Sequence, residues 1–259
     1  MNHTIDTTAP ANDHYLGLAG ASIVPTTASR LTQRHLATVI KARALCCVHG
    51  DIGLGKTFAI NTSLRDLAPD NTLWLECRKG APLGTLRAAL YRALALPGEP
   101  PAKSDAFDQL LLHAFAEQHR VLVCDEAQGL TRNSLEYLQT LWENRRTQLT
   151  IVLAGGDNCL QRIRSCSGLF SRVPIYQQYQ PLTPDEVLAL MPTYHALWQN
   201  VAPDDLMWIN DAACHGNFRN WAKVTFHVQD ILEQHPETAW FSRDTVRMVL
   251  SFLDSSIRS

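Results

Sequence analysis

The segment that most constrains how this chain folds is a glycine-rich octapeptide, Gly50-x-x-x-x-Gly55-Lys56-Thr57. A short apolar run at residues 44–48 precedes it, and residues 58–67 follow it with helical periodicity. Glycines let a backbone pass close to a phosphate, and the first N–H groups of a helix point toward such an anion. The segment therefore predicts a strand, a phosphate-binding loop and a helix in succession.

A loop of this kind is expected to bind ATP together with Mg²⁺. Lys56 supplies positive charge to the β- and γ-phosphates, and the Thr57 hydroxyl is placed to ligate the metal. A glycine-rich turn that binds nothing is the alternative interpretation. The residues expected to contact the nucleotide are Gly50, Asp51, Ile52, Gly53, Leu54, Gly55, Lys56, Thr57 and Phe58.

A second strand pattern ends in two carboxylates. Residues 121–124 are apolar, and Asp125 and Glu126 follow them directly. Ligands of open α/β sheets bind at the carboxyl ends of the strands. Asp125 is therefore expected to hold the Mg²⁺ shell with Thr57, and Glu126 is expected to act as the general base toward the attacking water. A strand that runs into a polar turn is the alternative.

Strand and helix patterns alternate on both sides of these motifs. Besides residues 44–48, strands are predicted at 72–77, 121–124, 150–154 and 173–179. Helices are predicted at 29–40, 58–67, 83–95, 104–118, 134–145 and 158–163. Such alternation predicts an α/β fold, with a parallel sheet sandwiched by helices.

The strand patterns stop near residue 183. Beyond it, helices are predicted at 184–190, 205–213, 217–233 and 242–254. Residues 1–28 are polar with little periodicity, which is typical of a flexible segment. We therefore expect a flexible N-terminal segment at 1–28, an α/β domain at 29–182 and a small C-terminal helical domain at 183–259.

Composition and charge narrow the class of protein. The chain is 46% hydrophobic and 19% charged, and no run approaches the roughly 18 apolar residues of a membrane span. The first ten residues lack the basic start and apolar core of a secretory signal, so a cytoplasmic location is expected. Residues 1–182 carry 18 basic and 15 acidic side chains, whereas residues 183–259 carry 5 and 10. Contact with nucleic acid would therefore have to rest on local basic clusters.

None of the seven cysteines shows the C-x-x-C spacing of zinc sites or redox pairs. They are Cys46, Cys47, Cys77, Cys124, Cys159, Cys166 and Cys214. Free cysteine behaves as a small hydrophobe, so buried thiols are expected. His49 lies two residues from Cys47, but this segment is better explained as a buried strand than as a metal site.

Arg172 is a candidate for contact with ATP bound to a neighbouring subunit. It lies just before the last predicted strand, and an arginine offered to the γ-phosphate would offset charge that develops in the transition state. Arg162 and Arg164 are alternates for the same role. A surface arginine without this role is the competing explanation.

Asn158 and Arg219 are further candidates on the γ-phosphate side. Asn158 follows the strand predicted at 150–154, where a strand-ending turn explains the sequence equally well. Arg219 stands at the start of the helix predicted at 217–233, from which it would reach the nucleotide. An ordinary surface arginine is again the alternative.

The order of these motifs resembles the AAA+ superfamily of P-loop NTPases over about residues 29–232, with the helical tail as the lid domain. The Asp-Glu-Ala-Gln core within residues 121–128, together with residues 151–155, looks like the transposition-regulator ATPases of the MuB, TnsC, TniB and IstB kind. This resemblance implies hydrolysis of ATP to ADP and phosphate and self-assembly into rings or helical filaments on double-stranded DNA. It also implies recruitment or activation of a DDE transposase during target selection.

The match to this group is uneven along the chain. Glycines stand where the family often places a polar first sensor, which leaves Asn158 one or two positions out of register. DNA contact in the group comes from basic residues on loops that line a central channel. The candidates here are Arg78, Lys79 and Lys103, and ordinary solvated charges are the alternative.

Two other functions share the same motifs. An ATP-driven switch for protein partners, as in secretion or signalling, would make no DNA contact, and such proteins usually add a membrane span, a peptidoglycan-binding module or a long sensor domain. A clamp-loader or helicase-loader ATPase, such as the DnaC group, has the same core. The sequence favours the transposition-regulator function and leaves these two open.

Overall fold

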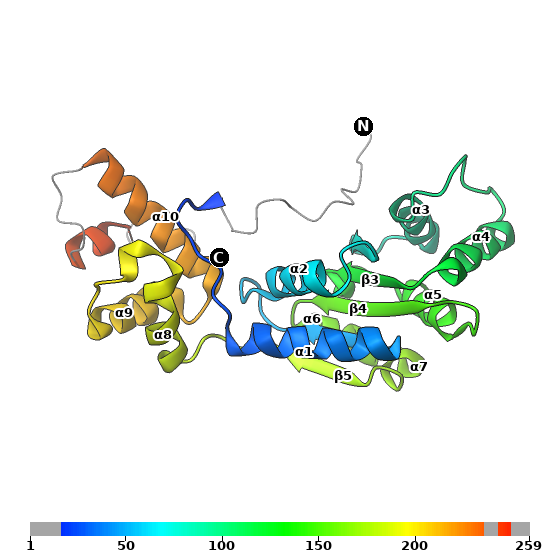
Figure 1. Ribbon diagram of the computed structural model, residues 1–259, viewed down its shortest axis with the longest axis horizontal. Coiled ribbons are helices and arrows are strands. Elements are labelled where there is room, and N and C mark those ends of the chain that lie inside the picture. Colours follow the sequence, from blue (N-terminus) through cyan, green and yellow to red (C-terminus); the bar gives the residue numbers. More distant parts are fainter. Residues whose placement is uncertain (1–16, 236–242, 250–259) are drawn as a thin grey trace. The chain divides into compact units, whose positions relative to one another are not determined.

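The structure is a computed structural model of the 259-residue chain, and it describes residues 17–235 and 243–249 (Figure 1). The described residues divide into two compact units. The first consists of Leu31–Asp51 and Lys56–Tyr179, and the second of residues 17–30, Ile52–Gly55, 180–235 and 243–249. The tip of the glycine-rich loop therefore groups with the second unit.

The first unit is built on a five-stranded parallel sheet. Its strands are β1 (Leu45–His49), β2 (Thr72–Glu76), β3 (Arg120–Asp125), β4 (Leu149–Gly155) and β5 (Ile175–Gln178), in the spatial order β2-β3-β4-β1-β5. Every residue of β1 and β4 is buried, as expected for central strands covered on both faces. The predicted α/β fold with a parallel sheet is confirmed.

Helices flank this sheet (Figure 1). They are α1 (Thr27–Ala42), α2 (Lys56–Leu67), α3 (Leu83–Ala93), α4 (Ser104–Glu117), α5 (Arg132–Glu143), α6 (Asn158–Arg164) and α7 (Ser167–Phe170), with a 3₁₀ turn at Ala127–Gly129. The predicted helices of this unit are present with ends shifted by a few residues. The sequence did not predict α7 or the 3₁₀ turn, because a single turn is too short to show a helical period.

The parallel register brings the functional segments to one edge of the sheet. His49 at the end of β1 pairs with Gly155 at the end of β4, and Glu76 at the end of β2 pairs with Asp125 at the end of β3. Parallel strands share a direction, so their carboxyl ends lie at the same edge. Loops that follow these strands can therefore contribute to one site.

The second unit is helical. It contains α8 (Pro184–Tyr194), α9 (Pro203–Ile209), a π-helical turn (Asn210–Cys214), α10 (Phe218–Gln234), a 3₁₀ turn (Ala196–Trp198) and a helix over 243–249. The rings of Trp198 and Trp221 pack edge to face at its centre, 5.6 Å apart, and the Trp198 indole N–H donates to the Thr225 hydroxyl at 2.9 Å. The remainder of the helix predicted at 242–254 lies outside the described residues.

Residues 17–26 form neither a long helix nor a strand, yet they pack into the second unit. Leu18 is buried in its core, and the Ser22 N–H donates to the carbonyl oxygen of Tyr194 at 2.7 Å. The Thr27 N–H at the start of α1 donates to the Glu186 carboxylate at 3.1 Å. Backbone contacts of this kind leave no periodic pattern in a sequence. The rest of the segment predicted to be flexible, residues 1–16, lies outside the described residues.

All seven cysteines are buried and none forms a disulfide, which confirms the prediction from the sequence. Among the residues that the structure describes, no group of three His, Cys, Asp or Glu side chains is arranged to hold a metal ion. In the same residues, no helix is both long and apolar enough to cross a membrane.

The cysteines are expected to react slowly with a thiol reagent in the native protein and to titrate as seven thiols after unfolding. The thiolate is the reactive form, and burial disfavours it, raising the pKa of Cys46 to about 12. A colorimetric thiol titration with and without guanidinium measures both values. Rapid reaction of several thiols in the folded protein would contradict the burial described above.

Candidate nucleotide-binding and catalytic site

The glycine-rich loop starts at a tightly packed residue. Gly50 has a φ of 137°, and a Cβ on it would lie 2.6 Å from the carbonyl oxygen of Tyr179. The Tyr179 N–H donates to the carbonyl oxygen of His49 at 2.7 Å, which brings the chain after β5 against the end of β1. Only glycine fits at this point, for both conformational and steric reasons.

Lys56 is the first residue of α2 and is only 9% exposed. Its ammonium donates to the carbonyl oxygens of Gly50 at 2.7 Å and Asp51 at 2.6 Å. Burial lowers the pKa of Lys56, while the carboxylates of Glu126 and Asp125 act in the opposite direction. The cation is thus held against the loop at the N-terminus of a helix, where an anion is favoured.

Thr57 and Asp125 form a pair of oxygen ligands next to Lys56. The Thr57 hydroxyl donates to Oδ2 of Asp125 at 3.1 Å, and the Glu126 N–H donates to Oδ1 at 3.0 Å. Burial raises the pKa of Asp125, and these two hydrogen bonds lower it. Mg²⁺ prefers oxygen ligands and is usually held by one or two protein side chains plus phosphates. The pair therefore fits the cation that the sequence predicts.

Glu126 adopts an unusual backbone conformation directly after β3. Its φ and ψ are 54° and 40°, in the left-handed region that non-glycine residues rarely occupy. Its carboxylate accepts a hydrogen bond from the side-chain amide of Gln128, whose oxygen accepts one from the Gly156 N–H at 3.2 Å. Reasoning from the sequence placed Gln128 in the Asp-Glu-Ala-Gln motif but gave it no role in the site. The glycines at the end of β4 could have indicated this contact, because a strand end without side chains leaves room for a side chain from another segment.

Asn158 is exposed as the first residue of α6. The polar side chain that lies against the end of β4 is that of Gln128 instead. A hydrogen bond between the carboxyl groups of Asp51 and Asp157 raises the pKa of Asp157. The predicted contact of Asn158 with the γ-phosphate stays a prediction.

Arg172 follows α7 and is exposed. Its guanidinium forms an ion pair with Glu143 at the end of α5. Of the two alternates, Arg164 places its guanidinium over the ring of Phe170 at 5.8 Å, and Arg162 is exposed on α6. Within its own chain, the Arg172 guanidinium is therefore paired with the end of α5. Its contact with ATP bound to a neighbouring subunit stays a prediction.

Arg219 lies in the first turn of α10, in the second unit, which also contains the tip of the loop at Ile52–Gly55. Asn217 caps this helix, since its Oδ1 accepts from the Arg219 N–H at 3.0 Å, and its Nδ2 donates to the carbonyl oxygen of Ile52 at 2.8 Å. The Arg219 N–H also lies 3.0 Å from the carbonyl oxygen of Gly53. Asn217 was not singled out from the sequence, although it caps a predicted helix.

Gly53 explains why the loop tip and the start of α10 approach so closely within this unit. Its φ is 87°, and a Cβ on it would lie 2.8 Å from the Cβ of Arg219. A side chain at this position would force the two segments apart.

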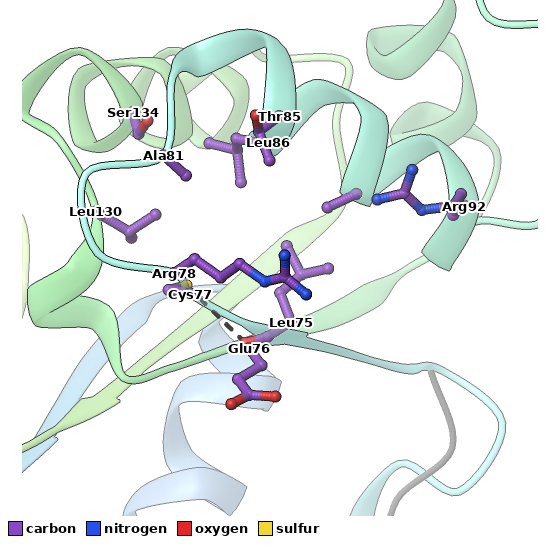
Figure 2. Close-up of a pocket in the computed structure, with 11 residues that line it drawn as sticks. Leu75, Glu76, Cys77, Arg78, Ala81, Thr85, Leu86, Arg92, Leu130 and Ser134 are labelled. Atoms are coloured by element: carbon purple, nitrogen blue, oxygen red, sulfur yellow. Dashed lines mark hydrogen bonds between the residues drawn. The ribbon is translucent and has the colours of Figure 1, made fainter. Parts of the chain in front are cut away.

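The candidate DNA contacts lie on two connections of the first unit. Arg78 and Lys79 follow β2, and Lys103 immediately precedes α4; all three are exposed. A cavity of about 90 Å³, lined by Arg78 and by Arg92 of α3, opens at the end of β2 (Figure 2). The Cys77 N–H donates to the carbonyl oxygen of Asp125 at 2.8 Å, so the connection after β2 is bonded to the end of β3.

One family model matches part of this sequence, and several solved structures share its fold. Residues 39–163 match the model of a family described as an AAA domain. No curated protein sequence matches the chain. Among solved structures, the Aeropyrum pernix ORC2 protein in its ADPNP-ADP complexes has a TM-score of 0.69 at 15% identity, over 89% of this chain and 70% of that one.

Two other solved structures are similar to a comparable degree. Cdc6p from Pyrobaculum aerophilum has a TM-score of 0.68 at 16% identity, over 84% of this chain and 64% of that one. The RuvB Holliday junction branch migration motor from Thermotoga maritima has a TM-score of 0.61 at 18% identity, over 87% and 68%. The chain thus has the α/β fold of AAA+ P-loop NTPase structures, and residues 39–163 match the model of an AAA domain.

Proposed function

We propose that this protein binds ATP with Mg²⁺, hydrolyses it to ADP and phosphate, and uses the ATP-bound state to assemble on double-stranded DNA. The observation that carries the ATPase part is the hydrogen bond of 3.1 Å between the Thr57 hydroxyl and the Asp125 carboxylate. It joins the end of the phosphate-binding loop to the end of β3, where Glu126 supplies a second carboxylate. The proposed metal ligands and the proposed base are therefore neighbours at the end of β3.

Each residue has a distinct part in the proposed reaction. The Lys56 ammonium binds the β- and γ-phosphates, and the oxygens of Thr57 and Asp125 hold the metal. Mg²⁺, when bound, neutralises charge on the phosphate oxygens. Glu126 accepts a proton from the water that attacks the γ-phosphorus. Arg219 from α10 and Arg172 from a neighbouring subunit offset the charge that develops on the transferred group.

For the biological role, we propose regulation of a DDE transposase through target selection or transposase recruitment. The resemblance of residues 121–128 and 151–155 to the MuB, TnsC, TniB and IstB group supports this role. A solved structure supports the DNA-binding part of the proposal. The Aeropyrum pernix ORC1 protein, which was solved in complex with DNA, has a similar fold, with a TM-score of 0.67 at 14% identity over 89% of this chain and 66% of that one.

Arg78 and Lys79 are the proposed DNA contacts, together with Lys103. Arg78 and Lys79 directly follow Cys77, whose N–H donates to the carbonyl oxygen of Asp125. A backbone hydrogen bond therefore joins the proposed DNA contacts to the proposed nucleotide site. A nearly neutral protomer can bind DNA if assembly aligns one small basic cluster per subunit, because phosphate neutralisation adds along the duplex. Such binding weakens steeply as salt rises.

Electron microscopy of the purified protein with double-stranded DNA tests this function. Samples with ATP, a slowly hydrolysed analogue and ADP are compared, at low and at moderate salt. Rings or filaments on DNA that require ATP or the analogue would support the proposal, and addition of a candidate transposase would follow. Free particles under every condition, with ATP hydrolysis intact, would instead favour an ATP-driven switch for protein partners.

Arg172→Ala is expected to lower hydrolysis by about 10-fold or more in assembled protein and to have little effect in dilute protein, because a finger acts across a subunit boundary. Its ion pair with Glu143 is exposed, so the variant should fold normally. Arg132→Ala, which removes another exposed ion pair on α5, is the matched control.

A mixing experiment separates action across subunits from action within one subunit. Glu126→Gln subunits lack the proposed base but are expected to bind ATP, assemble and keep Arg172, whereas Arg172→Ala subunits keep Glu126. Mixing two weakly active variants should restore hydrolysis if Arg172 acts on a neighbour. An equal loss for Arg172→Ala in dilute and in assembled protein would refute a finger in trans.

A further inference from the structure

We propose that Gln128 is a positioning residue that fixes the Glu126 carboxylate relative to the end of β4. This inference deepens the proposed ATPase function and rests on it. The end of β4 has glycines where a polar side chain is expected. The polar side chain there is supplied by Gln128, from the segment that follows β3.

The geometry of the Gln128 amide supports this role. Its nitrogen donates to Oε2 of Glu126, and its oxygen accepts from the Gly156 N–H at 3.2 Å. One side chain therefore connects the proposed base to the backbone of Gly156, directly after β4. The three groups come from the segments that directly follow β3 and β4, two strands that pair in parallel register.

Gly155 provides the space for this arrangement. A Cβ on Gly155 would overlap the side-chain oxygen of Gln128, and it would also lie 3.0 Å from the Cβ of Cys159. Gly155 is not in the left-handed region, so its backbone conformation does not call for glycine. The absence of a side chain there is explained by close packing against Gln128 and Cys159.

The chemistry of the contact requires an amide. Glutamine offers a donor to the Glu126 carboxylate and an acceptor to the Gly156 N–H at the same time. Glutamate at position 128 would keep the acceptor but lose the donor, and it would place a second carboxylate against the base. Asparagine would keep both the amide donor and the amide acceptor, but its side chain is one methylene shorter than that of glutamine.

Glu126 needs such support because it lies on an exposed turn. Its backbone is in the left-handed region and its side chain is exposed. The end of β4, by contrast, belongs to a strand in which every residue is buried. A base attached to the residue that follows this buried strand keeps the position that proton transfer requires, and displacement by about 1 Å can cost on the order of 100-fold in rate.

The first test is steady-state ATPase kinetics of Gln128→Ala and Gln128→Glu in the full-length protein. Both variants are expected to lower kcat by about 10-fold to 100-fold, with KM and the affinity for a fluorescent ATP analogue unchanged within about threefold. The matched control is Gln229→Ala, which removes another glutamine–glutamate hydrogen bond, 3.0 Å long, on α10. A Gln128→Glu protein with wild-type kcat would overturn the proposal, as would parallel losses in kcat and ATP affinity.

The second test is a double-mutant cycle with Glu126→Gln. If Gln128 acts through Glu126, adding Gln128→Ala to Glu126→Gln should cause no further loss in single-turnover hydrolysis. A purely structural role predicts the same fold-loss in both backgrounds, which would overturn the proposal. If wild-type protein binds ATP without hydrolysing it, the proposed function itself fails. Loss of activity in Glu126→Gln but not in Gln128→Ala refutes this inference alone.

Discussion

Lys56→Ala is expected to weaken ATP binding by about 30-fold to 4,000-fold, enough to abolish measurable binding at ordinary concentrations. Truncation of a charged group that meets an oppositely charged partner away from bulk water costs about 2–5 kcal/mol, and a factor of ten corresponds to about 1.4 kcal/mol. Lys56 meets this condition because it is only 9% exposed and lies against the loop at the start of α2. Titration of a fluorescent ATP analogue measures the effect.

The control for this variant is Lys41→Ala. Lys41 is exposed in the last turn of α1, so its loss removes the same charge without touching the loop. Circular dichroism and thermal unfolding establish that both variants fold. Near-normal ATP affinity in a folded Lys56→Ala protein would show that the loop binds nucleotide in another way, or not at all.

Glu126→Gln is expected to retain ATP binding and to hydrolyse ATP about 100-fold to 10,000-fold more slowly. A general base contributes a factor of this size, and the amide keeps the shape of the side chain while it loses the ability to take a proton. Lys56, Thr57 and Asp125 remain in place, so the affinity for ATP should change little. ATP-dependent assemblies should also persist longer than in the wild type.

Hydrolysis and binding are measured on the same preparation of this variant. Glu136→Gln carries the same chemical change on α5, where Glu136 forms an exposed ion pair with Arg132, and it should behave as wild type. Normal hydrolysis by Glu126→Gln would remove the role proposed for this carboxylate. Loss of binding together with hydrolysis would indicate that Glu126 supports the nucleotide site as a whole.

The elements of the first unit follow from local patterns. Segments of four to seven residues with strand character, placed between helical patterns, predicted each strand of the sheet, and the observed ends differ by one or two residues. Two short elements were missed, namely α7 and the 3₁₀ turn at Ala127–Gly129. In the second unit, the helix predicted at 205–213 is divided into α9 and a π-helical turn.

The candidate site was predictable where its residues are close in sequence or end a strand. The loop and its lysine lie within one octapeptide, and Asp125 and Glu126 mark the end of a buried run. Gln128 and Asn217 were not predictable in the same way. Their side chains bond to backbone groups 28 and 165 positions away, and no local pattern records such contacts.

By itself, the sequence determined an α/β unit with a parallel sheet, a phosphate-binding loop and carboxylates at a strand end, followed by helices. These features depend on periodicity, on glycine and on residue chemistry, which are local properties. Only the tertiary structure decided the order β2-β3-β4-β1-β5 and the placement of Gln128 against Glu126 and the end of β4. Buried parallel strands have interchangeable apolar patterns, so their order is settled by packing and by hydrogen bonds between distant segments.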